Sequence, residues 1–175
     1  IYIPHSYWLG ECQWQKNSVK DLGLYNVGKF SGKRISVSNT GSWSAKEFLP
    51  MGILENTHDK EFVLWQIESS GSWNWEISTM AKKLYLMANG PTFSENGWMK
   101  KLAPGESFST VRASVTFGAT FEETIANITD YRRACRRVND DNKKLPVIFN
   151  DYMNCLNADP STQKEIPLIN KAAEL

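Results

Sequence analysis

The sequence has little histidine and cysteine, and this shortage limits the metal and disulfide chemistry that it can carry. It contains two histidines, His5 and His58, and three cysteines, Cys12, Cys135 and Cys155. None of them shows the spacing of a metal site, and an odd number of cysteines leaves any disulfide framework incomplete. We expect no metal site and plain packing or surface roles for these residues. The odd cysteine count also favours a reducing compartment such as the cytoplasm.

The sequence also lacks an excess of one charge and a long apolar run. Twenty Lys and Arg residues nearly balance 19 Asp and Glu residues, for a net charge of +1. This balance gives no support for nucleic acid as a partner. No apolar run approaches the ~20 residues of a membrane span, so no membrane partner is expected either. The length of 175 residues corresponds to about one domain.

Tryptophan is abundant, with seven residues in the chain. Such residues either fill a core or form platforms for a ligand such as a sugar. Trp73, Trp75 and Ile77 alternate with polar residues, which predicts that the three point into a core. Trp43 lies beside a Gly/Ser turn and, of the seven tryptophans, is the one that we most expect to be exposed. Trp8 and Trp14, the residues that bracket "LGECQ", are predicted to pack or to form an interface.

Residues 1–118 show the two-residue period of β-strands. The stretch "KEFVLWQIES" has apolar residues on both faces, which predicts a strand covered from both sides. It is followed by "SSGS" and "WNWEIS", a pattern typical of a β-hairpin. "KKLYLMANG" and "PGESFSTVRASVTFG" are further predicted strands, and the second is expected to point Val111, Ala113, Val115 and Phe117 inward. Short strands separated by turns predict an antiparallel sandwich.

At Thr120 the period becomes helical. Thr120 and Glu123 form a predicted capping box, and an apolar stripe follows. The predicted stripe consists of Phe121, Ile125, Ile128 and Cys135. Arg132, Arg133, Arg136 and Arg137 fall in the last turns, where we expect a solvated, dipole-compensating end rather than a nucleic-acid patch.

The last thirty residues resemble one β/α unit. "LPVIFN" is apolar without alternation, which predicts a strand buried in a parallel sheet. Asp159 as N-cap and Pro160 in the first turn predict a helix start, with Thr162 and Glu165 as a further capping pair. Its predicted apolar face consists of Ile166, Ile169 and Ala173. Because a lone parallel strand has no partner, we expect the chain to be a piece of a longer protein.

Several stretches carry a resemblance to a known family, in the right order and over nearly the whole length. They are "SYWLGECQW", "NTGSWSAKEFLPMGILEN", "LWQIESSGSWNWEIS", "APGESF", "FEETIANITDYRRACRR" and "LPVIFNDYMN". "WQIESSGSWNWEI" and "LPVIFNDYMN" are the most specific. On these residues the chain resembles the α-galactosidases of glycoside hydrolase family 36.

The resemblance implies a mainly β fold: an antiparallel β-supersandwich, a linking α-helix and the first β/α unit of a truncated TIM barrel. The implied boundaries are residues 1–118 for part of the sandwich, 119–144 for the linking helix and linker, and 145–175 for the barrel start. It further implies retaining hydrolysis of terminal α-linked galactose in oligosaccharides such as melibiose and raffinose, without a cofactor. Related proteins form homo-tetramers, so a homo-oligomer is expected.

Three alternatives stay open from the sequence. Two belong to the same family: an α-N-acetylgalactosaminidase and a raffinose-synthase-type transferase. The residues that would separate them from an α-galactosidase are expected in the rest of the barrel. The third is a non-catalytic carbohydrate-binding or interaction sandwich.

The resemblance places the catalytic nucleophile and acid/base, both aspartates, on later barrel strands, so no catalytic residue is expected in these 175 residues. The expected substrate contacts are Tyr152, Asp151 and Asn150, directly after the first strand. Tyr152 stands where the family often has a Trp that lines the galactose subsite. An aromatic ring there can stack on the apolar face of a sugar. Asp151 is expected to be a polar loop residue rather than a catalyst.

Overall fold

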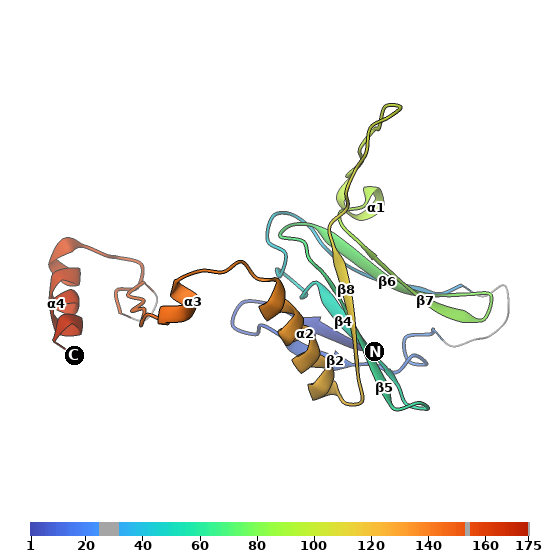
Figure 1. Ribbon diagram of the computed structural model, residues 1–175, viewed down its shortest axis with the longest axis horizontal. Coiled ribbons are helices and arrows are strands. Elements are labelled where there is room, and N and C mark those ends of the chain that lie inside the picture. Colours follow the sequence, from blue (N-terminus) through green and yellow to red (C-terminus); the bar gives the residue numbers. More distant parts are fainter. Residues whose placement is uncertain (25–31, 153–154, 175) are drawn as a thin grey trace. The chain divides into compact units, whose positions relative to one another are not determined.

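The computed structural model describes residues 1–24, 32–152 and 155–174 (Figure 1). They form two compact units, residues 1–135 and 136–175. The first unit contains two antiparallel sheets and the helix α2 (Phe121–Cys135). The second contains the short helix α3 (Asp141–Lys144) and the helix α4 (Thr162–Ala173).

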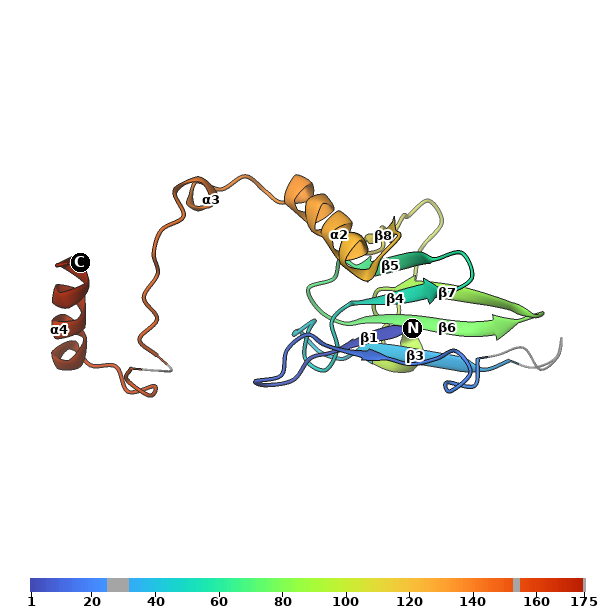
Figure 2. The same cartoon turned by 90° about the horizontal axis from the view of Figure 1, so that it is seen from below.

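Eight strands build the sheets of the first unit (Figures 1 and 2). The five-stranded sheet has the order β2-β1-β4-β5-β8, with β2 (Gln13–Lys16), β1 (Tyr2–His5), β4 (Met51–Asn56), β5 (Glu61–Ile67) and β8 (Ala113–Gly118). The three-stranded sheet has the order β3-β6-β7, with β3 (Arg34–Asn39), β6 (Trp73–Met80) and β7 (Lys83–Asn89). A one-turn helix, α1 (Phe93–Asn96), follows β7. The predicted mainly β, antiparallel fold is therefore confirmed.

The core between the two sheets is built around tryptophans. Trp65, Trp73 and Trp75 are each at most 1% exposed, and Ile77 is buried beside them. Trp65 and Trp75 come from opposite sheets and meet edge to face, with ring centroids 5.2 Å apart. The prediction that the alternating residues of "WNWEIS" point into a core is confirmed. Their burial removes large apolar surfaces from water, which is the main stabilising term in folding.

The strand β5 is covered on both faces, as predicted. Trp65 and Ile67 belong to the cluster between the sheets. Leu64 points the other way, into a second cluster with Ile53 and Ile128 of α2. The run of apolar residues without simple alternation follows from this double burial.

The predicted hairpin between "KEFVLWQIES" and "WNWEIS" is wrong. β5 and β6 belong to different sheets, so the link between them passes from one layer to the other. β5 pairs instead with β4 and β8, and β6 with β3 and β7. The true hairpin is β6–β7, whose two central residues, Ala81 and Lys82, both have positive φ. The free energy gained by burying Trp65 and Trp75 between the two sheets outweighs the preference of the short Gly-containing segment for a tight turn.

The strand β8 is shorter than predicted, and its apolar side chains are exposed. Val115 and Phe117 are 53% and 55% exposed, whereas Ser114 and Thr116 are partly buried. β8 is the outer strand of the larger sheet, and α2 packs on the face that carries Thr116. Ala113, Val115 and Phe117 lie opposite Ile67, Trp65 and Val63, so they share the face that carries the core between the sheets, as predicted. They stay exposed because β8 is an edge strand that this core does not cover.

Helix α2 begins as the sequence predicts. The Thr120 hydroxyl accepts a hydrogen bond from the Glu123 amide at 3.1 Å, and the Glu123 carboxylate accepts one from the Ala119 amide at 2.8 Å. Ile128 is buried, and Phe121 and Ile125 pack against the same cluster. Cys135, the predicted last member of the stripe, is exposed, and Tyr131 takes its place one turn earlier. The helix therefore docks on the sandwich through its first three turns (Figure 2).

Two polar contacts fix the end of α2 to β5 and the residue that follows it. The Arg132 Nε donates to Gln66 Oε1 at 2.7 Å, so this arginine is not simply solvated as expected. The Tyr131 hydroxyl donates to the Glu68 carboxylate at 2.6 Å, and this bond lowers the pKa of Glu68 below its usual 4.5. The same bond raises the pKa of Tyr131 to about 12. Arg112 forms an ion pair with Glu68 at 3.0 Å.

We expect Tyr131→Phe to lower the melting temperature at neutral pH. A lowered carboxyl pKa in the folded state adds stability above 4.5, and this contribution disappears as the pH falls through the lowered pKa of Glu68. The gap in melting temperature between wild type and variant should therefore narrow below pH 4.5. Thermal melts followed by circular dichroism across this range provide the measurement. A difference in melting temperature that stays constant with pH would show that the hydrogen bond from Tyr131 does not lower the pKa of Glu68.

The second unit does not contain the predicted strand. Residues 145–150 form neither a strand nor a helix, Leu145 has a φ of 47°, and Val147 and Ile148 are fully or largely exposed. A parallel strand needs hydrogen-bonded neighbours, and the described residues offer none here. The helix is present, but it starts later than predicted, with Ser161 rather than Asp159 as N-cap. Ile166 and Ile169 on its predicted apolar face are 49% and 62% exposed, and no described residue of this unit covers them.

Candidate functional site

The three predicted substrate contacts follow the unpaired segment in the second unit. The Asn150 side chain accepts a hydrogen bond from the Tyr152 amide at 3.0 Å, which closes a local turn. Tyr152 is 54% exposed, with its ring available to solvent. Asp151 is half-buried and lines a cavity of about 300 Å³ beside α4. Their role in sugar binding stays a prediction.

The cavity beside α4 combines one apolar wall with two carboxyl groups. Asp151 and Glu165 line it together with Phe149, Leu168, Ile169 and Ala172. The structure thus brings Asp151 next to the helix, on a side that includes Ile169 of the predicted apolar face. Exposed apolar side chains of this kind indicate a surface that another part of a protein covers, rather than a catalytic centre.

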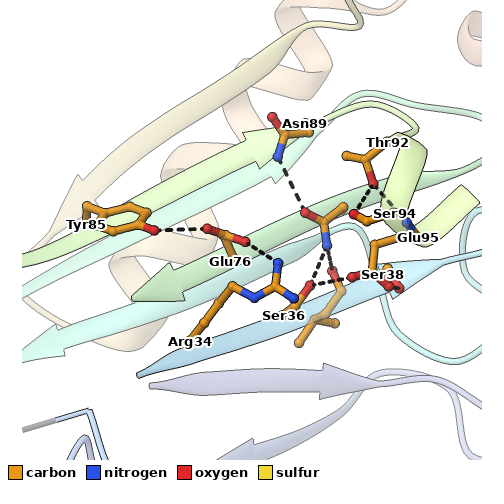
Figure 3. A network of polar contacts seen from close by, with 11 residues as sticks. Arg34, Ser36, Ser38, Glu76, Tyr85, Asn89, Thr92, Ser94 and Glu95 are labelled. Carbon is orange, nitrogen blue, oxygen red and sulfur yellow. Dashed lines mark hydrogen bonds and ion pairs between the residues drawn. The ribbon is translucent and has the colours of Figure 1, made fainter. Parts of the chain in front are cut away.

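A network of polar side chains occupies the outer face of the three-stranded sheet (Figure 3). Asn74, Glu76 and Ser78 of β6 are all buried, although they alternate with the core tryptophans. Buried polar groups cost free energy unless they are hydrogen-bonded. Each of them therefore needs hydrogen-bond partners. Residues on β3 and β7 supply these partners for Asn74 and Glu76.

Glu76 is the charged centre of this network. One of its carboxylate oxygens contacts the Arg34 guanidinium at 3.2 Å, and the other accepts a hydrogen bond from the Tyr85 hydroxyl at 3.1 Å. The three residues come from β3, β6 and β7, so the carboxylate links all three strands of the sheet (Figure 3). Both oxygens have a partner, which suits a structural acceptor better than a free acid or base.

Asn74 is the second buried centre. Its Nδ2 donates to the Ser36 hydroxyl at 2.7 Å and to the Val37 carbonyl at 3.4 Å. Its Oδ1 accepts a hydrogen bond from Asn89 Nδ2 at 3.4 Å. The rigid sheet thereby orients the amide of Asn89, which lies at the end of β7.

Helix α1 closes the same face. Thr92 caps it by accepting a hydrogen bond from the Glu95 amide at 3.2 Å. The Glu95 carboxylate in turn accepts hydrogen bonds from Ser36 and Ser38 of β3, each at 3.5 Å (Figure 3). Asn96 donates to the Asn39 carbonyl at 3.1 Å. These bonds hold the start of the loop after β7 against the sheet.

A cavity of about 470 Å³ opens where β7 leaves the sheet. Two aromatic residues line it, Trp98 and Phe108, with ring centroids 5.3 Å apart and planes tilted by 39°. Asn89 and Thr92 of the polar network also line it, so the network and the cavity are continuous. The remaining lining residues are Ala88, Gly90, Pro91, Ser109, Thr110 and Val111.

Comparison with family models, with curated proteins and with solved structures finds no match to this chain. The site therefore has to be interpreted from its own geometry. Among the described residues, no group of three His, Cys, Asp or Glu side chains could hold a metal ion. No helix in the described part of the chain is long and apolar enough to cross a membrane.

The sequence reasoning missed the cavity at Trp98 and Phe108. Neither residue belongs to a periodic stretch, and only the turn between them gives a signal. Gly105 has a φ of 87°, and the Glu106 amide donates to the Ala103 carbonyl at 3.0 Å, as in a Pro-Gly turn. Aromatic residues on both sides of "LAPGES" could have predicted that the chain folds back and pairs them.

The other tryptophan predictions have mixed outcomes. Trp14 packs edge to face on Phe121, with centroids 5.4 Å apart, as predicted for a packing residue. Trp43 is exposed as predicted, at 60%, but Trp8 is more exposed, at 66%. Trp8 follows the end of β1 in a turn, where no described residue buries its ring.

Proposed function

We propose that this chain carries part of a retaining α-galactosidase. It would supply part of the N-terminal sandwich, the linking helix, and the first strand and helix of a (β/α)8 barrel. The observation that supports this best is the order of the parts: an antiparallel sandwich, a helix packed on it, and a second unit, residues 136–175, that contains "LPVIFNDYMN". The sequence stretches that resemble the family occur in the same order along the chain.

In this proposal the chemistry belongs to barrel strands that follow residue 175. Retaining hydrolysis needs two carboxyl groups about 5 Å apart, one as nucleophile and one as acid/base. Active sites of such barrels lie at the carboxyl ends of the strands. Tyr152 would stack on the galactose ring, and Asp151 and Asn150 would hydrogen-bond its hydroxyls. These three residues bind and orient the substrate, while the proton and the glycosyl group are transferred elsewhere.

The proposal also accounts for the exposed residues 145–150. In a complete barrel, this segment would pair with the second and the last strand and be covered by helices. The exposed side chains of Val147, Ile148 and Ile169 would then be buried. A homo-oligomer, as in related enzymes, is part of the same proposal.

Activity measurements test the proposal. We expect no turnover of p-nitrophenyl α-galactoside by the purified 175-residue chain. The protein expressed from a reading frame that contains the whole barrel should hydrolyse it with retention, and its rate should not change with chelators. Turnover by the 175-residue chain, or no glycosidase activity in the longer protein, would contradict the proposal. Preference for an N-acetylgalactosaminide, or transfer rather than hydrolysis, would favour the two alternatives within the family.

A further inference from the structure

The cavity at the end of β7 differs from the core in how it uses aromatic residues. Trp98 and Phe108 are 39% and 44% exposed, whereas the core tryptophans of the sheets are fully buried. The two rings pack on one another and leave the rest of their surface to the cavity. Both residues belong to the long loop that extends from the sandwich between α1 and β8 (Figure 1). A cavity lined by aromatic and apolar side chains with a few polar groups is typical of a small-molecule site.

Polar groups form another part of the lining. Asn89 contributes an amide, and Thr92, Ser109 and Thr110 contribute hydroxyls. The Asn89 amide nitrogen is already engaged with Asn74, so its Oδ1 is the atom left to accept a hydrogen bond from a ligand. Because Asn74 is 3% exposed and held by β3, the acceptor is fixed in place before any ligand arrives. Preorganised polar groups in an otherwise apolar cavity set the orientation of a ligand.

The lining residues carry no charge, which restricts the class of ligand. A phosphate, a carboxylate or a cation would find no counter-ion among them. Lys100 does not line the cavity, but its ammonium group lies over the Phe108 ring, 5.3 Å from the centroid. It therefore engages one of the two aromatic rings in a cation–π contact and leaves Trp98 as the better stacking surface.

We propose that this cavity binds a neutral sugar ring. The apolar face of a pyranose would stack on Trp98, and its hydroxyls would donate to Asn89 Oδ1 and exchange hydrogen bonds with Ser109 and Thr110. The volume of about 470 Å³ lies within the range of small-molecule sites, roughly 300–1,000 Å³. No carboxylate lines the cavity, so the site binds a sugar without hydrolysing it. The inference rests on the lining residues and not on the proposed galactosidase activity.

Binding can be measured on the 175-residue chain by following the indole ¹H–¹⁵N signals while raffinose, galactose or glucose is added to tens of millimolar. We expect one indole signal, assigned to Trp98 through Trp98→Phe, to shift in a saturable way. Trp98→Ala should weaken binding at least tenfold, and Asn89→Ala by a similar factor. Trp43→Ala provides the control, because Trp43 is also an exposed indole and does not line this cavity.

The outcomes separate this inference from the proposed function. Saturable sugar binding that is lost in Trp98→Ala and kept in Trp43→Ala supports it, whatever the activity of a longer protein. No shift with any of the three sugars overturns it, as does equal loss in both variants. Binding of indole or another flat apolar compound without sugar binding also overturns the assignment to sugars. Circular dichroism melts establish that each variant is folded, and Asn89→Ala supplies a second variant if Trp98→Ala is not.

Discussion

Replacing Trp75 with Ala should destabilise the sandwich by about 3–5 kcal/mol, a large part of the total stability of a small domain. Trp75 is fully buried and packs edge to face on Trp65 from the opposite sheet. Its removal leaves a cavity between two sheets whose strands are held by their own hydrogen bonds, so the layers cannot close without breaking these bonds. Denaturant unfolding followed by circular dichroism measures the loss.

Two further variants define the cause of this loss. Trp75→Phe keeps an aromatic ring and removes the indole N–H, which has no hydrogen-bond partner among the described residues. It should cost much less than Trp75→Ala, because an unpaired buried donor is removed together with part of the apolar surface. Trp43→Ala, at a site that is 60% exposed, should change the free energy of unfolding little. Equal losses in all three variants would show that Trp75 does not have this role in the core.

Replacing Gly118 with Ala should displace the start of helix α2 and cost about 1–3 kcal/mol. A Cβ atom at this position would lie 2.5 Å from Thr124 Oγ1 and 2.8 Å from the Thr124 backbone nitrogen. Thr124 is fully buried and its hydroxyl donates to the Thr120 carbonyl at 2.7 Å, so it cannot move aside alone. The helix therefore has to shift as a whole, away from Leu64 and the cluster below it.

Gly71→Ala is the matched control for this change. A Cβ atom there would meet its nearest neighbour, the Gly41 carbonyl oxygen, at 3.5 Å, which is an ordinary van der Waals contact. The same chemical substitution should therefore be nearly neutral at Gly71 and costly at Gly118. Amide signals of α2 should shift only in Gly118→Ala. If the two variants had the same stability, the close contact between β8 and α2 would not be a constraint on the fold.

Local patterns predicted much of the first unit because their cause is local. Alternation placed Trp73, Trp75 and Ile77 on one face of a strand, and the pleat of a strand leaves no other arrangement once one face is buried. The Thr120–Glu123 capping box marked the start of α2, since its hydrogen bonds form within one turn. The double burial of β5 was likewise visible as apolar residues on both faces.

The failures concern partners that lie far away along the chain. β5 and β6 were predicted to pair because a short turn joins them, but they lie in opposite sheets. Val115 and Phe117 on β8 share the face of Trp65, as predicted, but they stay exposed, and sequence periodicity does not tell how far the core extends over an edge strand. Residues 145–150 have the composition of a buried strand, yet composition cannot supply the neighbouring strands that such a strand needs.

The candidate sites show the same division. The sequence pointed to Asn150, Asp151 and Tyr152 through a resemblance, and the structure places Asp151 beside α4 and leaves Tyr152 exposed. The cavity at Trp98 and Phe108 could not be read from the sequence. Its residues come from β7, from the loop after α1 and from the approach to β8, and only the folded chain brings them together.

The sequence by itself determined the inward face of β6, the start of α2 and the absence of a long apolar run, since these depend on neighbours within a few residues. Tertiary structure alone decided which sheet each strand joins, which face of β8 is covered and that Asn74 orients Asn89 toward an aromatic cavity. Burial of large side chains such as Trp65 and Trp75 makes these choices, because the free energy gained depends on which surfaces meet across the whole domain.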